Sequence, residues 1–282
     1  MAFTTTISAA QLISHIDDPD WVIVDSRFKL ANPAQGRADY ENAHIPGAVY
    51  AHLDDELSSP VVKGVTGRHP LPNVDHISKV FSRLGIDKNV QVVSYDDVGG
   101  ALAAARVWWL LRWLGHEAAA VLDGGWQAWV DQNYPTRSGV ERRLARTFIP
   151  HPRPELVVST DQIDKMRTDP AYRVLDARSA DRFRGENEVI DPVAGHIPGA
   201  ISAPYGGNLN PDGTFKSQKS IAEMYKRLIG DVPIDHVVCY CGSGVTAAHN
   251  VLALEIAGLG EARLYAGSYS EWIIDPKRPV EK

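Results

Sequence analysis

An internal repeat constrains the fold of this 282-residue chain more than any single motif does. Four blocks of the first half return in the second half in the same order. They are 24–27 (VDSR) with 175–178 (LDAR), 44–48 (HIPGA) with 196–200 (HIPGA), 91–95 (QVVSY) with 236–240 (HVVCY), and 123–126 (DGGW) with 266–269 (AGSY). The first two pairs are offset by 176 − 25 = 151 and 196 − 44 = 152 residues. A nearly constant offset predicts two similar domains in tandem.

Short apolar runs alternate with helical patterns along the chain. The runs at 21–24, 91–94 and 119–122 have the length and composition of buried strands, whereas 102–114 has those of a long apolar helix. Such alternation favours a mainly parallel sheet flanked by helices. We therefore predict the α/β class for both domains.

A stretch rich in arginine and proline separates the two copies. Pro150, Pro152 and Pro154 disfavour both a helix and a central strand. We expect a first domain at 1–137, a linker at 138–156 and a second domain at 157–282. Two domains agree with a typical size of about 100 to 200 residues per domain.

Composition limits the expected partners and location. The 29 Lys and Arg against 35 Asp and Glu give a net charge of −6, and no basic run stands out, so we expect no nucleic-acid partner. The first residues lack the pattern of a signal peptide, and no apolar run reaches the length of about 18 residues that a membrane span needs. We expect a cytoplasmic protein with no membrane partner. The two cysteines, Cys239 and Cys241, are too close in sequence for a disulfide between them to stabilise a fold of this size. We therefore expect free thiols, one of which can serve a chemical role.

Cys241 follows the apolar strand predicted at 236–240 and precedes a helix that begins near Thr246. Gly242 and Gly244 let the intervening backbone turn tightly, so that its N–H groups can converge on one anion. Ligand sites of parallel sheets lie at the carboxyl ends of strands, and a helix N-terminus also favours negative charge. We predict that Cys241 is a nucleophile and that Cys239, within the strand, belongs to the core.

Two other interpretations of Cys241 are disfavoured by the sequence. A cysteine at a strand end can serve as a small hydrophobic residue, but the glycine-rich loop and its place in the repeat disfavour that. Tyrosine phosphatases also place cysteine on a strand-to-helix loop, with arginine six positions later to bind phosphate. Ala247 stands at that position, so the loop lacks a bidentate hold on a phosphate dianion.

The duplicated Asp-x-Arg and HIPGA motifs, the loop CGSGVT at 241–246 and the segment GSYSEW at 267–272 resemble the two-domain rhodanese and 3-mercaptopyruvate sulfurtransferase family. The resemblance covers nearly the whole chain. It implies tandem rhodanese-like domains and an enzyme that carries sulfane sulfur as a persulfide on Cys241. A small-molecule donor supplies the sulfur, and cyanide, a thiol or a thioredoxin-like protein accepts it. No metal and no organic cofactor are implied.

The first domain carries Asp96 in the register of Cys241, followed by a loop two residues longer. A carboxylate cannot carry sulfane sulfur. We therefore expect the first domain to be a non-catalytic partner that closes over the active site.

The loop sequence separates branches of the family. The loop CGSGVT resembles that of the mercaptopyruvate branch, whereas the loop of thiosulfate-preferring enzymes resembles CRKGVT. Mercaptopyruvate leaves as an enolate that needs a proton, and thiosulfate is a dianion that benefits from cations. By similarity, a proton relay falls on Ser243, His69 and Asp54, and 3-mercaptopyruvate is the expected donor. The rest of the donor loop falls on Gly242, Gly244, Val245 and Thr246.

Arg182 matches the family arginine that binds the anionic end of the donor, and its planar fork suits a carboxylate or a sulfonate. The mercaptopyruvate branch carries a second arginine before GHIPG, but 186–192 (ENEVIDP) contains none. Arg184 is the expected substitute. Two alternatives stay open: a thiosulfate:cyanide sulfurtransferase, and a persulfide-carrying regulatory module whose turnover is incidental.

Overall fold

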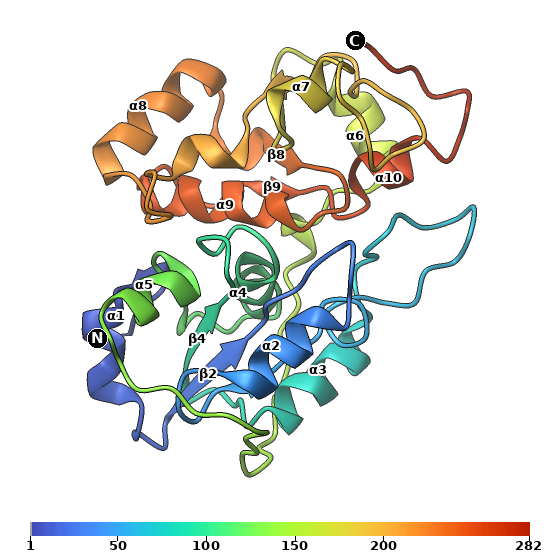
Figure 1. The fold of residues 1–282 in the computed structure, drawn as a ribbon. Helices are drawn as coiled ribbons and strands as arrows, with labels where there is room; N and C mark the ends of the chain where they lie inside the picture. Colours follow the sequence, from blue (N-terminus) through green and yellow to red (C-terminus); the bar gives the residue numbers. More distant parts are fainter. Residues whose placement is uncertain (1) are drawn as a thin grey trace. The chain divides into compact units, whose positions relative to one another are not determined.

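Two parallel sheets organise the chain, one in each of two units (Figure 1). The structure is a computed structural model and describes residues 2–282. Of the residues described, the N-terminal unit comprises 2–59, Pro72–Arg153 and Asn210–Phe215, and the C-terminal unit comprises Pro60–Leu71, Pro154–Leu209 and Lys216–Lys282. The predicted α/β class with two similar domains is confirmed.

The sheet of the N-terminal unit has the strand order β1-β5-β4-β2-β3, and each neighbouring pair is parallel. Its elements are β1 (Thr6–Ile7), α1 (Ala9–Leu12), η1 (Ile13–His15), β2 (Trp21–Asp25), α2 (Gln35–Asn42), β3 (Val49–Tyr50), α3 (Val74–Arg83), β4 (Gln91–Tyr95), α4 (Ala103–Trp113), β5 (Ala119–Leu122) and α5 (Gly125–Asp131). The three predicted strands correspond to β2, β4 and β5, and the predicted long helix corresponds to α4. Helix α4 packs against β4 and β5, and nearly all of its side chains are buried as a result.

The sheet of the C-terminal unit has the order β7-β6-β8-β9, again parallel throughout. Its elements are η2 (Pro154–Leu156), α6 (Thr160–Met166), β6 (Arg173–Asp176), α7 (Ala180–Phe183), β7 (Ile201–Ser202), η3 (Tyr205–Asn208), α8 (Gln218–Ile229), η4 (Ile234–His236), β8 (Val237–Tyr240), α9 (Thr246–Ile256), β9 (Arg263–Leu264) and α10 (Ser268–Trp272). This order matches β3-β2-β4-β5 of the first sheet. A parallel bridge between Val157 and Leu264 takes the place of the β1–β5 pairing. The repeat in sequence is therefore a repeat in structure.

The repeated Asp-x-Arg motif ties each central strand to its HIPGA turn. The buried Arg27 guanidinium donates to both Asp25 carboxylate oxygens at 2.6 to 3.1 Å, and the Tyr95 hydroxyl donates to the same carboxylate at 2.6 Å. Arg27 also donates to the carbonyl oxygen of Ala43 at 2.6 Å, directly before the turn. The second copy repeats the ion pair and the carbonyl bond at Asp176, Arg178 and Gly195. These contacts explain the recurrence, because a buried ion pair requires both partners.

Two segments belong to a unit that their place in the sequence does not suggest. Pro60–Leu71 is part of the C-terminal unit, and Asn210–Phe215 is part of the N-terminal unit. Within the predicted linker, the N–H of Phe148 donates to Ser82 Oγ at 3.0 Å, so this part packs with the N-terminal unit. The domain boundaries at 137/138 and 156/157 stay a prediction.

The helices of both units are short. The longest in residues 2–282 is α8, with 12 residues. None of the helices described has the length and apolar character that crossing a bilayer requires. The cytoplasmic location stays a prediction.

Candidate active site

The Cys241 loop runs from the end of β8 to the start of α9. Gly244 has a φ of +77°, and a Cβ atom there would lie 2.2 Å from the carbonyl oxygen of Ala266. Glycine is therefore required for both its conformation and its lack of a side chain. The tight turn expected from the glycines is present.

Cys241 is held at the centre of this turn. The residue is 2 % exposed, and its Sγ accepts a hydrogen bond from the Gly244 N–H at 3.2 Å. The Cys241 N–H donates to Ser268 Oγ at 3.1 Å, and its carbonyl accepts from the Tyr269 N–H at 3.0 Å. The fourth repeated block of the sequence thus fixes the backbone of the loop. The N–H that binds the sulfur belongs to Gly244, two residues before α9 begins.

Ser243 and His69 form the second part of the site. Ser243 Oγ lies 2.7 Å from His69 Nδ1, and both residues are buried. His69 belongs to Pro60–Leu71, which is anchored where the Arg68 N–H donates to Ser270 Oγ at 3.1 Å. The structure thus brings together two predicted residues that are 174 positions apart. Asp54 is partly buried in the N-terminal unit, and its place in the relay stays a prediction.

Two arginines flank the loop. Arg182 forms a bidentate pair with Glu188 at 2.9 and 3.0 Å and donates to Asp191 Oδ2 at 2.9 Å. Arg68 binds the other carboxylate oxygen of Asp191. A Cβ atom on Gly242 would lie 2.6 Å from Arg68 Nη2 and 3.7 Å from Arg182 Nη2. A shared carboxylate therefore holds both guanidinium groups beside the loop.

The two carboxylates of this cluster are buried, with only 1 % of each side chain exposed. Burial by itself raises the pKa of Glu188, but hydrogen bonds from Arg182 and from the N–H groups of Asp191 and Ile190 outweigh it and lower this pKa below its ordinary value. Glu188 is therefore ionised at neutral pH. Two acids thus pair with two arginines, and the guanidinium N–H groups that the acids leave free can donate to a further anion.

Three other predicted site residues have simpler surroundings. Arg184 is exposed, and Glu186 binds its guanidinium at 2.6 and 2.8 Å. Val245 is the buried N-cap residue of α9, and Thr246 is the first residue of that helix. Their roles in donor binding stay predictions.

Cys239 differs from Cys241 although both thiols are free. Cys239 is fully buried in β8. Burial raises the pKa of its thiol well above the ordinary range, and the nearby Cys241 raises it further. Cys239 is thus a core residue, as predicted, and the role of Cys241 as the nucleophile stays a prediction.

Three residues of the site were missed at the sequence level, namely Arg68, Glu188 and Asp191. Arg68 directly precedes His69, so its proximity to a relay candidate was a usable signal. Glu188 and Asp191 lie in the stretch 186–192, which contains no arginine. No spacing rule joins them to Arg68, because that contact depends on where Pro60–Leu71 packs.

A cavity of about 270 Å³ adjoins this cluster within the C-terminal unit. Arg68, Asp191 and Ser270 line it, together with apolar side chains that include Ile190 and Ile273. Over residues 2–282, His, Cys, Asp and Glu side chains form no group of three or more that could hold a metal ion. The cavity thus combines cationic and apolar walls next to the loop.

Comparisons with known proteins identify the family and the fold of this chain. A family model described as "Rhodanese-like domain" matches residues 8–132 and 159–275. A probable 3-mercaptopyruvate sulfurtransferase of Pseudomonas aeruginosa is 44% identical over 281 residues, which cover 99% of each chain. A putative thiosulfate sulfurtransferase, SseB of Mycobacterium tuberculosis, is 41% identical over 283 residues, covering 97% of this chain and 95% of that protein. The crystal structure of SseA from Escherichia coli, described under 3-mercaptopyruvate sulfotransferases, matches with a TM-score of 0.82 and 30% identity, covering 95% of this chain and 100% of that one.

Proposed function

The chain belongs to the family of rhodanese-like domains and is a sulfurtransferase, and on this basis we propose that 3-mercaptopyruvate is its preferred sulfur donor. The sulfur passes through a persulfide on Cys241 to a thiophilic acceptor: cyanide, a thiol or a thioredoxin-like protein. The observation that carries the proposal is the buried hydrogen bond between Ser243 and His69. Ser243 is two residues after Cys241 in the sequence. The expected setting is the cytoplasm, without nucleic acid or membrane as partner.

The first half-reaction forms the persulfide. The Cys241 thiolate attacks the donor sulfur, a new S–S bond forms, and the C–S bond of mercaptopyruvate breaks. The bonding electrons leave with the carbon skeleton as the enolate of pyruvate. The Gly244 N–H, at 3.2 Å from Sγ, supports negative charge on the attacking sulfur.

The enolate must gain a proton, and Ser243 is placed to supply it. Its hydroxyl lies 2.7 Å from His69 Nδ1, so His69 can return a proton to Ser243 as the serine gives up its own. Asp54 completes the relay in this proposal. A sulfur carrier without turnover has no need of such a hydrogen bond.

Arg182 and Arg68 bind the anionic end of the donor. Both lie next to Gly242, and Asp191 fixes their orientation. Arg68 thereby supplies the second guanidinium that the stretch 186–192 lacks. Arg184, paired with Glu186 at the surface, is the competing candidate for this role.

The second half-reaction returns the enzyme to its starting state. An acceptor thiolate attacks the outer sulfur of the persulfide, and the Cys241 thiolate leaves. The cavity of about 270 Å³ beside Arg68 and Ser270 offers room for a small thiol.

Thiosulfate is the second candidate donor, because two guanidinium groups beside the loop also suit a dianion. The relative at 41% identity carries that name. Steady-state rates with 3-mercaptopyruvate and thiosulfate, measured with one common acceptor, decide between them. We expect the larger kcat/KM with 3-mercaptopyruvate. A larger value with thiosulfate would overturn the donor assignment and leave the Cys241 persulfide to be tested by mass spectrometry.

A further inference from the structure

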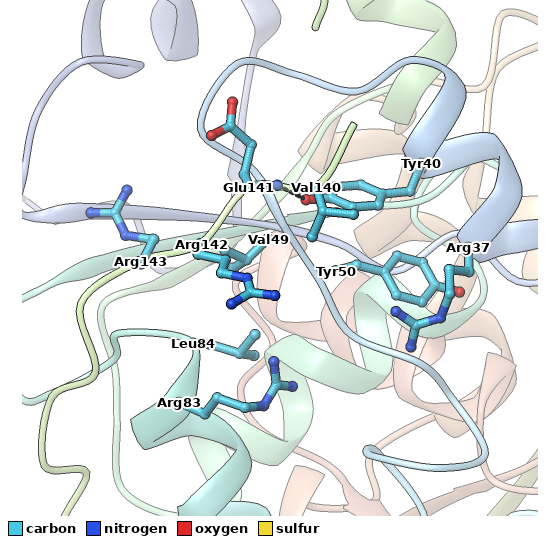
Figure 2. Close-up of a pocket in the computed structure, with 10 residues that line it drawn as sticks. All are labelled: Arg37, Tyr40, Val49, Tyr50, Arg83, Leu84, Val140, Glu141, Arg142 and Arg143. Carbon is cyan, nitrogen blue, oxygen red and sulfur yellow. Dashed lines mark hydrogen bonds between the residues drawn. The ribbon is translucent and has the colours of Figure 1, made fainter. Parts of the chain in front are cut away.

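A second cavity, of about 400 Å³, lies entirely within the N-terminal unit, which lacks the reactive cysteine (Figure 2). Helix α2, strand β3, the end of α3 and the extended segment 140–143 form its walls. The lining residues most relevant to binding are Arg37, Arg83, Arg142, Tyr50, Leu84 and Val140. We call this cavity the arginine pocket.

Guanidinium groups dominate the arginine pocket, although the chain as a whole carries a net charge of −6. Figure 2 shows the side chains of Arg37, Arg83 and Arg142 directed towards a common space from three different segments. Arg37 lies over the Tyr50 ring at 4.8 Å, and Arg83 pairs with Glu56. Among residues 2–282, no ion pair joins Arg37 or Arg142 to a carboxylate.

The one acidic residue of the lining, Glu141, does not balance this charge. Its carboxylate accepts hydrogen bonds from Arg137 at 3.2 Å and from the Gly47 N–H at 3.4 Å, and Figure 2 shows it directed away from the three guanidinium groups. The fourth arginine, Arg143, donates to the carbonyl oxygen of Pro19 at 2.9 Å. Burial and the neighbouring Arg146 lower the pKa of Arg143, as expected where positive charge gathers.

We infer that the arginine pocket binds a small organic anion with at least two negative charges, of the phosphate-ester or polycarboxylate class. Planar guanidinium forks bind the paired oxygens of both groups. The apolar and aromatic wall formed by Tyr50, Leu84 and Val140 suits the carbon skeleton of such a molecule. The volume lies within the range of about 300 to 1,000 Å³ that is typical of small-molecule sites.

Isothermal titration calorimetry on the full chain tests the inference, with inorganic pyrophosphate and citrate as separate probes. We expect saturable binding of at least one probe, and the better probe tells phosphate recognition from carboxylate recognition. The double variant R37Q/R142Q should weaken that binding by about tenfold or more, because it removes two guanidinium groups that have no carboxylate partner. R142K keeps the charge but loses the planar fork, so its affinity for the probe should lie between those of the wild type and R37Q/R142Q. Binding should also weaken at high salt.

Two controls separate the arginine pocket from other anion sites. R227Q removes an exposed arginine of α8 and should leave binding unchanged. R182Q removes a cation beside the Cys241 loop and should also leave it unchanged. An unaltered sulfurtransferase rate of R37Q/R142Q without probe shows that this variant folds. Absence of binding of both probes to the wild type, equal binding by R37Q/R142Q, or loss of binding in R182Q alone would each overturn the inference.

Discussion

The loops that follow β4 and β8 begin at equivalent positions of two matching sheets, but they begin with different residues and have different lengths. Asp25 pairs with Tyr95 in one sheet and Asp176 with Tyr240 in the other, so Asp96 and Cys241 occupy equivalent positions. Residues 96–102 separate β4 from α4, and residues 241–245 separate β8 from α9, which confirms that the first loop is longer by 7 − 5 = 2 residues.

Asp96 fills its own loop. Its fully buried carboxylate accepts hydrogen bonds at 2.8 to 3.2 Å from four backbone N–H groups. The donors are Val98, Gly100, Leu102 and Ala104. Burial raises the pKa of Asp96, and these four hydrogen bonds oppose the increase. The turn after β4 therefore directs four backbone N–H groups at its own carboxylate, whereas in the turn after β8 the Gly244 N–H donates to Cys241 Sγ.

The Cys241 loop differs in the side chains that it carries. Ser243 stands two residues after the cysteine, where the other loop has Val98. The offset of the Asp-x-Arg motif places Arg182 opposite 182 − 151 = 31, which is Ala31. The same strand-to-helix turn thus directs backbone N–H groups at a side chain in both units, while the side chains around that turn differ between them.

The largest expected effect tests whether sulfur at position 241 is the reacting atom. Cys241→Ser should abolish sulfur transfer and the gain of about 32 Da that one sulfur atom adds to a thiolate nucleophile. Intact-protein mass spectrometry after treatment with 3-mercaptopyruvate measures this gain. Cys239→Ala is the matched control and should keep most of the activity, because Cys239 lies inside β8. A persulfide on the Cys241→Ser protein would refute the assignment.

The second prediction concerns Ser243, whose counterpart in the loop after β4 is Val98. Ser243→Ala should lower kcat for 3-mercaptopyruvate by roughly 10² to 10⁴, the range for loss of a positioned proton-transfer group. Thiosulfate needs no such proton, so its rate should fall far less. If both donors lose the same factor, Ser243 only shapes the loop.

The third prediction asks which arginine accompanies Arg182. Arg182→Lys and Arg68→Lys keep the charge but lose the fork, so each should raise KM for 3-mercaptopyruvate by about tenfold with a smaller change in kcat. Arg184→Lys is the matched variant at the surface and should change KM little. A larger increase in Arg184→Lys than in Arg68→Lys would favour Arg184 as the second clamp.

The smallest effect on activity is expected from a change in the loop after β4, at Asp96. Asp96→Asn replaces one acceptor oxygen by an NH₂ group that faces two N–H donors, so it should lower the free energy of unfolding by about 1 to 3 kcal/mol. Urea denaturation measures this loss. Asp97→Asn, at the partly exposed neighbouring position, should cost about 1 kcal/mol or less. Equal stability of the two variants would show that the buried carboxylate is not needed to hold the turn.

Local patterns located most elements because short apolar runs bounded by polar residues are sufficient for a buried strand. The run 119–122 coincides with β5, and the helix predicted at 102–114 differs from α4 by one residue at each end. Helix ends depend on capping geometry, which single-residue patterns describe poorly. The packing of Pro60–Leu71 with the C-terminal unit has no such signal, because it depends on contacts far along the chain.

The sequence by itself determined the tandem α/β plan and the position of Cys241, because repeated blocks and a strand–glycine–helix pattern are local properties. Only the tertiary structure decided which groups surround the sulfur. It brought His69 to Ser243, placed Arg68 and Arg182 on one carboxylate, and closed the Asp96 loop with four N–H groups. Such contacts join residues that are distant in sequence, and their geometry follows from how the whole chain packs.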